Sequence, residues 1–238
     1  MKKSLKVLSA LLTYPTAELQ AAVPEMRAAL DAEGRLPQKC RDRVDRILEQ
    51  LATWDLYELQ ERYTFLFDRT RSLSLNLFEH VHGEGRDRGQ AMVDLKQLYE
   101  RHGLALASNE LPDYLPLFLE FLSEIPEPEA CELIGETAHI LEAIRLRLKR
   151  RKAPYSSVFS SLLALSRSTP AAEILEALLT APDDDPNDLA ALDAAWLDEE
   201  VKFGPGAAAD CGTDGLATRI RAARRPAPGV AQPSSGDS

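Results

Sequence analysis

The sequence lacks any apolar run of the roughly 18 to 20 residues that a helix needs to cross a bilayer. Its N-terminal apolar stretch is interrupted by Lys6, and the following Tyr14-Pro15-Thr16 is a poor cleavage site for a signal peptide. We therefore expect residues 4–13 to form a first helix that packs on the body of the protein, without membrane insertion. This interpretation predicts a cytoplasmic protein.

Cysteine is also scarce. The three cysteines, Cys40, Cys131 and Cys211, lie far apart and form no CxxC pair, which argues against a disulfide framework and against a cysteine-built zinc site. His80 and His82 are two residues apart, whereas metal-binding helices place their ligand pairs three or four residues apart. The sequence therefore predicts no metal site and no cofactor.

Basic charge is in deficit, with 28 Lys and Arg residues against 38 Asp and Glu residues and a net charge of −10. This balance argues against non-specific binding of nucleic acid, which needs a basic surface, and favours neutral or basic partners. Motifs for catalysis are missing too. The four histidines lie in no recognisable motif, the serines of 72–74 lack a nucleophile elbow, and the glycines of 83–89 have the wrong spacing for GxGxxG. We expect a protein that is not an enzyme.

Helical periodicity is present along most of the chain, and 45% of the residues are hydrophobic. This pattern predicts an all-α fold, a single globular domain of several helices. Residues 72–77 alternate polar and apolar as a strand does, but we predict a helix because no second strand is available for pairing. The other predicted helices are 17–31, 38–52, 54–69, 111–123, 128–152, 155–166 and 170–180, with helical patterning through Met92, Leu95 and Tyr99 that stops near Gly103.

Composition changes near the end of the helical region and predicts three parts. Residues 1–180 form the helical domain, and residues 181–203 are an acidic extension with one candidate helix at 188–200. Residues 204–238 are dominated by Gly, Pro, Ala and Ser. Because such a segment buries too little apolar surface to offset its ordering entropy, we predict that this tail is disordered.

Two stretches combine aromatic and charged residues. In 63–71 three aromatic residues are followed at once by alternating charges, and 110–121 is apolar except for its carboxylates. Each stretch is compatible with core packing beside a solvated end, or with an apolar slot and a charged rim that captures an amphipathic peptide helix. Asp113 lies inside an almost wholly apolar stretch and most needs an explanation.

Three segments carry a family resemblance. YTFLFDRTRSLSLNLFEHVHGEGRDRGQAMVDL at 63–95, LPDYLPLFLEFL at 111–122 and LLTYPT at 11–16 resemble the NarJ-type chaperones of respiratory nitrate reductase, and the likeness extends over residues 1–175. The resemblance implies an all-helical, non-catalytic chaperone for nitrate respiration. Its partner would be the apo alpha subunit, whose N-terminal segment it binds before membrane attachment while the molybdenum cofactor is inserted. Cofactor-loading proteins are further candidate partners. A helical adaptor without a maturation role is the alternative.

The broader chaperone group has a Glu-Pro-x-Asp-His type motif at its peptide-binding side. Here the sequence is Glu110-Leu111-Pro112-Asp113-Tyr114, so the proline is displaced by one position and a tyrosine replaces the histidine. The resemblance therefore implies roles in peptide binding for Asp113 and for Tyr114.

We expect a groove with aromatic walls and a charged rim. Its apolar lining is predicted to come from Tyr63, Phe67, Phe78 and Phe118. The carboxylates expected to meet a basic client peptide are Asp68, Glu79, Asp113 and Glu120. The rim is completed by His80 as a hydrogen-bond partner and by cations that pair with the carboxylates or touch the client, namely Arg69, Arg71, Arg86 and Arg88.

Overall fold

The computed structural model describes residues 1–82, 86–106, 110–166 and 168–180. Within these ranges every regular element is a helix, and the strand-like pairing is limited to one isolated antiparallel bridge. The predicted all-α, single-domain fold is therefore confirmed. The predicted extension and tail, 181–203 and 204–238, lie outside the described residues.

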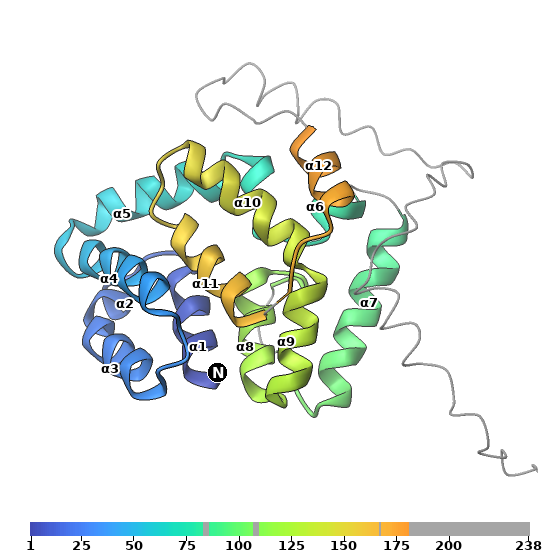
Figure 1. Cartoon of the computed structure of the whole chain (residues 1–238), viewed down its shortest axis with the longest axis horizontal. Coiled ribbons are helices and arrows are strands. Elements are labelled where there is room, and N and C mark those ends of the chain that lie inside the picture. The colour runs from blue at the N-terminus through green and yellow to red at the C-terminus, as the bar shows by residue number, and fades with distance from the viewer. Residues whose placement is uncertain (83–85, 107–109, 167, 181–238) are drawn as a thin grey trace, which may run out of the picture.

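Most of the helices follow one another through short connections (Figure 1). In chain order they are α1 (Lys2–Leu11), α2 (Ala17–Ala21), α3 (Val23–Glu33), α4 (Gln38–Thr53), α5 (Leu56–Tyr63), the π-helical turn η1 (Thr64–Asp68), the 3-10 turn η2 (Arg71–Leu73), α6 (Glu79–His82), α7 (Arg86–Arg101), α8 (Leu115–Glu124), α9 (Glu127–Glu136), α10 (Ala138–Arg150), α11 (Ser156–Ser166) and α12 (Ala172–Thr180).

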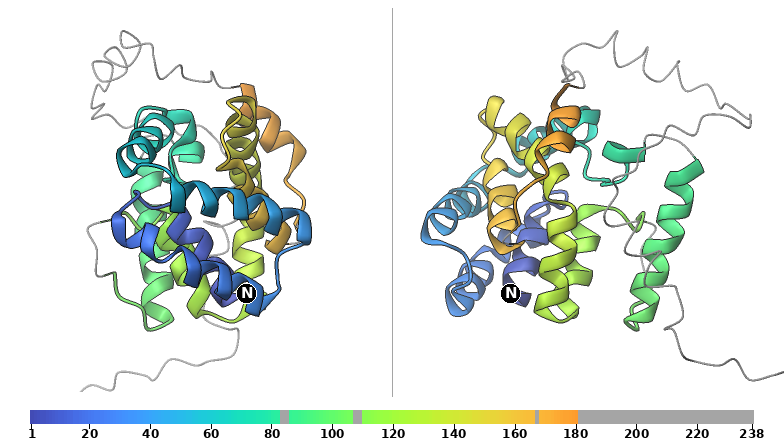
Figure 2. Two further views of the ribbon diagram at one scale, coloured as in Figure 1. Left: turned by 90° about the vertical axis from the view of Figure 1, so that its left-hand side faces the viewer. Right: turned by 45° about the vertical axis from the view of Figure 1, so that its right-hand side comes forward.

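Helix α1 is central to the packing. It lies against α8, α3 and α11, and its Leu5 and Leu8 side chains are 0% exposed. Full burial of one such side chain contributes about 1.5–3 kcal/mol. Ser9 faces α8 and donates a 2.7 Å hydrogen bond to the Pro116 carbonyl. Helix α7 forms one edge of the fold and packs through Tyr99 on Phe121 of α8, with ring centroids 4.4 Å apart (Figure 2).

The first turn of α1 is capped by a side chain from α3. The Glu33 carboxylate accepts 2.8 Å hydrogen bonds from the backbone N–H groups of Lys3 and Ser4, which have no partner inside the helix. Burial opposes ionisation of Glu33, but hydrogen bonds from Ser4 and Lys3 outweigh it and lower the pKa to about 2. Glu33, the last residue of α3, therefore holds the N-terminal end of α1 against α3.

Two predicted helices are each divided in the structure. The predicted helix 17–31 breaks at Ala22 into α2 and α3, because Pro24 has no N–H to continue the ladder and lies in the first turn of α3. The predicted helix 128–152 breaks at Thr137, whose hydroxyl bonds the Ile134 carbonyl at 2.8 Å while its backbone turns to φ −90° and ψ 0°. Periodicity continues across both breaks, so the sequence pattern alone did not reveal them.

The predicted helix 54–69 is observed with a change of hydrogen bonding. Asp55 caps α5 by accepting a 2.9 Å hydrogen bond from the Tyr57 N–H. After Tyr63 the helix widens into η1, where the Arg69 N–H bonds the Thr64 carbonyl five residues back at 3.0 Å. A π-turn inserts one extra residue and is often found at functional sites.

The predicted helix 72–77 is wrong. Only its start is helical, as part of η2. Leu75 then lies in a bend, Asn76 forms the isolated bridge, and Leu77 begins a turn. The Leu77 N–H donates to the Asp113 carbonyl at 3.1 Å, and the Leu115 N–H donates to the Leu75 carbonyl at 2.8 Å. The expected obstacle was the lack of a second strand, but a single bridge needs only the short loop before α8 as its partner.

Two element boundaries shift from their predicted positions. Helix α8 begins at Leu115 rather than at residue 111, so Pro116 lies in its first turn, where a missing N–H costs no hydrogen bond. Helix α7 begins at Arg86, so residues 86–89 of the glycine-rich segment 83–89 are helical.

The remaining helices match their predicted spans closely. Helix α4 has one buried apolar face, made of Val44, Ile47, Leu48 and Leu51. Cys40 and Cys131 are free thiols and half-buried. Within the described ranges, no helix combines the length and apolar character needed to span a bilayer.

Candidate functional site

A backbone clamp joins the loop before α8 to the segment before α6. Asn76 and Tyr114 form the isolated antiparallel bridge, and the Tyr99 hydroxyl donates a 2.6 Å hydrogen bond to the Pro112 carbonyl. These contacts fix the loop that carries Asp113 at the centre of the molecule.

Asp113 faces the interior. Its side chain is 0% exposed, and its Oδ2 accepts a 2.9 Å hydrogen bond from the Phe78 N–H. Its Oδ1 is buried without a hydrogen-bond partner among the described residues. Burial raises the pKa of Asp113, although the Phe78 N–H and the positive charge of Arg88 oppose that shift. The carboxylate thus acts as a tertiary staple here, and its predicted contact with a client peptide stays a prediction.

A tyrosine pair lies beside this clamp. The Tyr63 hydroxyl donates to the Leu12 carbonyl at 2.9 Å and lies 3.3 Å from the Tyr114 hydroxyl. Because the single Tyr63 proton points to Leu12, Tyr114 is the donor between the two hydroxyls. Burial raises the pKa values of both Tyr63 and Tyr114, so both phenols stay neutral near pH 7.

The pair continues to the molecular surface through Tyr14. This ring meets Tyr63 edge-on, with centroids 5.5 Å apart and planes at 85°, and it is 46% exposed. Tyr114 is half-buried. An aromatic patch therefore reaches solvent where the segment after α1, the end of α5 and the loop before α8 meet.

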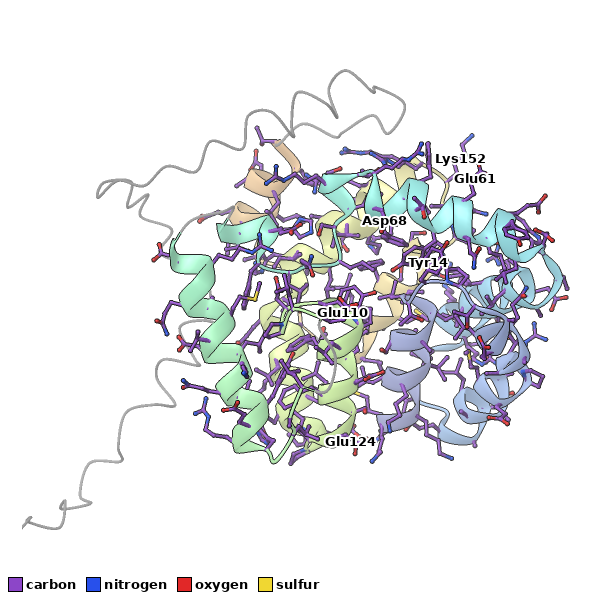
Figure 3. All side chains as sticks on the ribbon, turned by 180° about the vertical axis from the view of Figure 1, so that it is seen from behind. Tyr14, Glu61, Asp68, Glu110, Glu124 and Lys152 are labelled. Carbon is purple, nitrogen blue, oxygen red and sulfur yellow. The ribbon has the colours of Figure 1, made fainter. Side chains whose placement is uncertain are left out.

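Two carboxylates flank this patch. Asp68 and Glu110 are exposed. Burial of Tyr114 is the main cause of its raised pKa, and the negative charges of these two carboxylates raise that pKa further. Figure 3 shows Tyr14, Asp68 and Glu110 on one face of the molecule. Neither carboxylate pairs with a cation in the described ranges. We call Tyr14, Tyr63, Tyr114, Asp68 and Glu110 the acidic tyrosine surface.

The four aromatics predicted to line a groove are buried. Tyr63 and Phe67 are 4% and 7% exposed, and Phe78 and Phe118 are 2% and 0% exposed. Phe67 packs on Tyr63 and on Tyr155, with centroids 5.0 and 5.1 Å away. All four belong to the hydrophobic core, and only Tyr63 is also part of the acidic tyrosine surface. Their role in peptide binding stays a prediction.

The predicted rim residues Glu79 and His80 interact within the clamp. Arg88 donates a 3.0 Å hydrogen bond to the Glu79 carboxylate and pairs with it, as expected for this cation. His80 Nε2 lies 2.9 Å from the Ser74 carbonyl, and burial lowers the pKa of His80. A neutral His80 with its proton on Nε2 therefore ties α6 to the Ser74 carbonyl in the segment before it.

The other predicted charges are spread over the surface. Arg69 and Arg71 are exposed beside η1 and η2, and Glu120 is exposed on α8. The Arg86 side chain lies outside the described part of the structure. The described side chains include no group of three or more His, Cys, Asp or Glu that could hold a metal ion.

Sequence reasoning missed Tyr14 and Leu111 as candidate site residues and placed Glu110 only in a motif. Leu111 is 45% exposed next to Glu110. The available signal was local: Tyr14 precedes Pro15, and Leu111 precedes Pro112, so both belong to non-helical segments that favour exposure.

Comparison with known proteins gives a consistent result. The family described as nitrate reductase delta subunit matches residues 16–161. The nitrate reductase molybdenum cofactor assembly chaperone NarJ of Escherichia coli K12 is 45% identical over 201 residues, which cover 84% of each chain. The NarW protein of the same strain is 39% identical over 199 residues, covering 84% of this chain and 83% of NarW.

A crystal structure described as a redox enzyme maturation protein from Archaeoglobus fulgidus shares the fold. The TM-score is 0.51 at 21% sequence identity, and the match covers 68% of this chain and 91% of that one. At this identity the likeness supports the helical architecture alone.

Proposed function

The chain belongs to the nitrate reductase delta subunit family, and from this premise we propose that it is an assembly chaperone that binds an N-terminal segment of a nitrate reductase catalytic subunit. The protein is a nitrate reductase molybdenum cofactor assembly chaperone of the NarJ type, not an enzyme. The proposal concerns the segment of the client that it binds and the surface that binds it.

The acidic tyrosine surface is the observation that supports this proposal. Tyr14 offers an exposed aromatic ring, and the carboxylates of Asp68 and Glu110 form no ion pair within the described ranges. An amphipathic segment with basic residues would place its apolar side chains on the rings and its cations beside the carboxylates. Tyrosine is well suited to this task, because its ring adds contact area at a low cost in side-chain entropy.

The charge of the whole chain acts in the same direction. A net charge of −10 attracts a basic segment over long range and raises the rate of encounter. Because the two flanking carboxylates are exposed, their attraction weakens as salt increases. Binding driven by this surface should therefore combine a salt-dependent part with an apolar part.

Calorimetric titration of the full chain with a synthetic peptide tests the proposal. The peptide carries the N-terminal segment of the catalytic subunit from the same organism, and a scrambled peptide of equal composition is the control. We expect saturable binding of the native peptide alone, with a negative heat-capacity change from apolar burial. A folded chain that binds neither peptide would overturn the proposal.

The helical adaptor gives a different result in the same assay. An adaptor needs a folded surface on its partner, so it would bind the assembled catalytic subunit and leave the isolated peptide unbound. The chaperone should bind the peptide and lose the client once its N-terminal segment is folded into the enzyme.

A further inference from the structure

A concave region lies where the middle of α4, the C-terminal end of α10 and the start of α11 meet. It is an open groove of about 420 Å³. No acidic side chain lines it within the described ranges. We call it the basic groove, because its lining includes five cations: Arg43, Arg46, Arg145, Lys149 and Lys152.

Four of these cations form no ion pair in the part of the chain that the structure describes. Arg145 is paired with Glu142, which accepts hydrogen bonds of 2.6 and 2.5 Å from its guanidinium. The side chains of the other four form no ion pair with any acidic residue that the structure describes. This lack of ion pairs is unexpected, because the chain has 38 acidic and 28 basic residues and its carboxylates outnumber its cations.

The helix dipole accounts for only part of this arrangement. Lys149 lies in the last turn of α10, where a cation is favourable. Arg43 and Arg46, however, lie in the interior of α4, far from the C-terminal end at Thr53. Like charges three or four residues apart repel each other on a helix surface. Arg43 and Arg46 are three residues apart on α4, and Arg145 and Lys149 are four residues apart on α10. This repulsion lowers the stability of the fold, and the helix dipole does not offset it at Arg43 and Arg46.

The backbone at Lys152 is a second, independent observation. Its φ of 54° is the only left-handed value at a non-glycine residue among those described. The turn ends α10, with the Lys152 N–H on the Lys149 carbonyl at 3.0 Å and the Ala153 N–H on the Leu148 carbonyl at 2.9 Å. Glycine fits such a position without strain. A lysine here adds a charge to the groove but strains the backbone, and such strain is typical of functional sites.

We propose that the basic groove binds a small anion that carries a phosphate or pyrophosphate group. Its volume lies within the roughly 300–1,000 Å³ of small-molecule sites. Its lining comes from three helices and is short, which suits a compact anion better than an extended acidic peptide. Several cations converge on one space, as recognition of a multiply charged group requires. Ser156, Ser157 and Ser160 of α11 also line the groove, so its wall is polar beside the cations.

The test is calorimetric titration of the full chain with inorganic pyrophosphate at about 150 mM salt, where weak surface attraction is screened. We expect saturable binding by the wild type. The Lys149→Ala/Lys152→Ala variant should bind about tenfold or more weakly. The matched control, Lys96→Ala/Arg150→Ala, removes the same charge from exposed positions outside the groove and should bind as the wild type does.

Lys152→Gly separates binding from folding. Because glycine relieves the left-handed strain, this variant should melt at a higher temperature than the wild type while its pyrophosphate affinity falls. A purely structural lysine would not show this opposition. If glycerol phosphate competes with pyrophosphate, the groove accepts phosphate esters; if only inorganic phosphates bind, its ligand is the free anion.

Three results would overturn the proposal. The wild type could show no saturable binding of pyrophosphate, or the control variant could lose as much affinity as the groove variant. An aspartate-rich peptide could also occupy the groove without being displaced by pyrophosphate, which would identify an acidic protein segment as the ligand instead.

Discussion

The buried Asp113 carboxylate accepts a 2.9 Å hydrogen bond from the backbone N–H of Phe78. This contact and the backbone bridge beside it hold the loop before α8 on the segment before α6. The loop also carries Tyr114 and Glu110 of the acidic tyrosine surface. Asp113 therefore positions the surface from the inside, without being part of it.

Replacing Asp113 distinguishes its hydrogen bond from its charge. Asp113→Ala leaves the buried Phe78 N–H without an acceptor, which should cost about 1–3 kcal/mol in unfolding free energy. Asp113→Asn keeps an acceptor oxygen and removes a buried charge, so it should be as stable as the wild type or more stable at pH 7. Urea unfolding of the three proteins gives the comparison. Equal losses in both variants would contradict the staple role.

The same pair predicts a dependence on pH. Burial raises the folded-state pKa of Asp113 above its unfolded value, so the folded state binds more protons and wild-type stability falls as pH rises from about 4. Asp113→Asn lacks this loss. The stability advantage of the asparagine variant should therefore be smallest below pH 4 and should grow toward neutral pH. An advantage that shrinks on raising the pH would have the wrong sign.

The tyrosine pair should respond unequally to loss of its hydroxyls. Tyr63→Phe removes the donor to the buried Leu12 carbonyl and should cost about 1–2 kcal/mol. Tyr114→Phe removes only the 3.3 Å contact from a half-buried side chain and should cost less than about 1 kcal/mol. Thermal or urea unfolding measures both. A larger loss at Tyr114 would show that the donor assignment is reversed.

Glu33 should stabilise the fold above the pH at which it titrates. Hydrogen bonds from Ser4 and Lys3 outweigh the effect of burial and lower its pKa to about 2. The stabilisation is complete above the unfolded pKa near 4.3 and is lost as pH falls toward 2. Glu33→Gln should lower the unfolding free energy by about 1–3 kcal/mol at pH 7 and should lose less stability on acidification. Wild type and variant with parallel acid unfolding curves would contradict this.

Sequence periodicity was sufficient for the fold but not for the breaks inside it. The stripe of Val44, Ile47 and Leu48 predicts a buried helix face because every third or fourth residue shares a side of the helix. The break at Thr137 and the non-helical segment after Leu73 leave the apolar pattern intact, since they change the backbone and not the residues that face the core.

The candidate site was only partly predictable for the same reason. Tyr63 and Asp68 are clustered along the chain, and the sequence identified them. Tyr14 reaches Tyr63 only through the packing of α1 on the body of the protein. Nor could the sequence separate groove from core at Phe78 and Phe118, because apolar side chains suit both and burial is decided by tertiary contacts.

The acidic tyrosine surface makes a specific prediction about charge. Asp68→Asn/Glu110→Gln should weaken binding of a basic client peptide by about three- to tenfold at low salt, because each lost carboxylate removes a surface attraction of up to about 1 kcal/mol. The difference from wild type should shrink as salt rises toward 1 M, where the screening length is about 3 Å. Calorimetric titration across a salt series measures both effects.

The matched control is Glu58→Gln/Glu61→Gln, which removes the same charge from exposed positions on α5 outside this surface. Both double variants lower the long-range attraction of the chain equally, but only the Asp68 and Glu110 variant removes carboxylates that contact the peptide. The control should therefore lose much less peptide affinity. Tyr14→Ala should weaken binding at every salt concentration, because its contribution is apolar contact and not charge. If the two double variants lose equal affinity, net charge alone attracts the peptide and the acidic tyrosine surface is not where it binds.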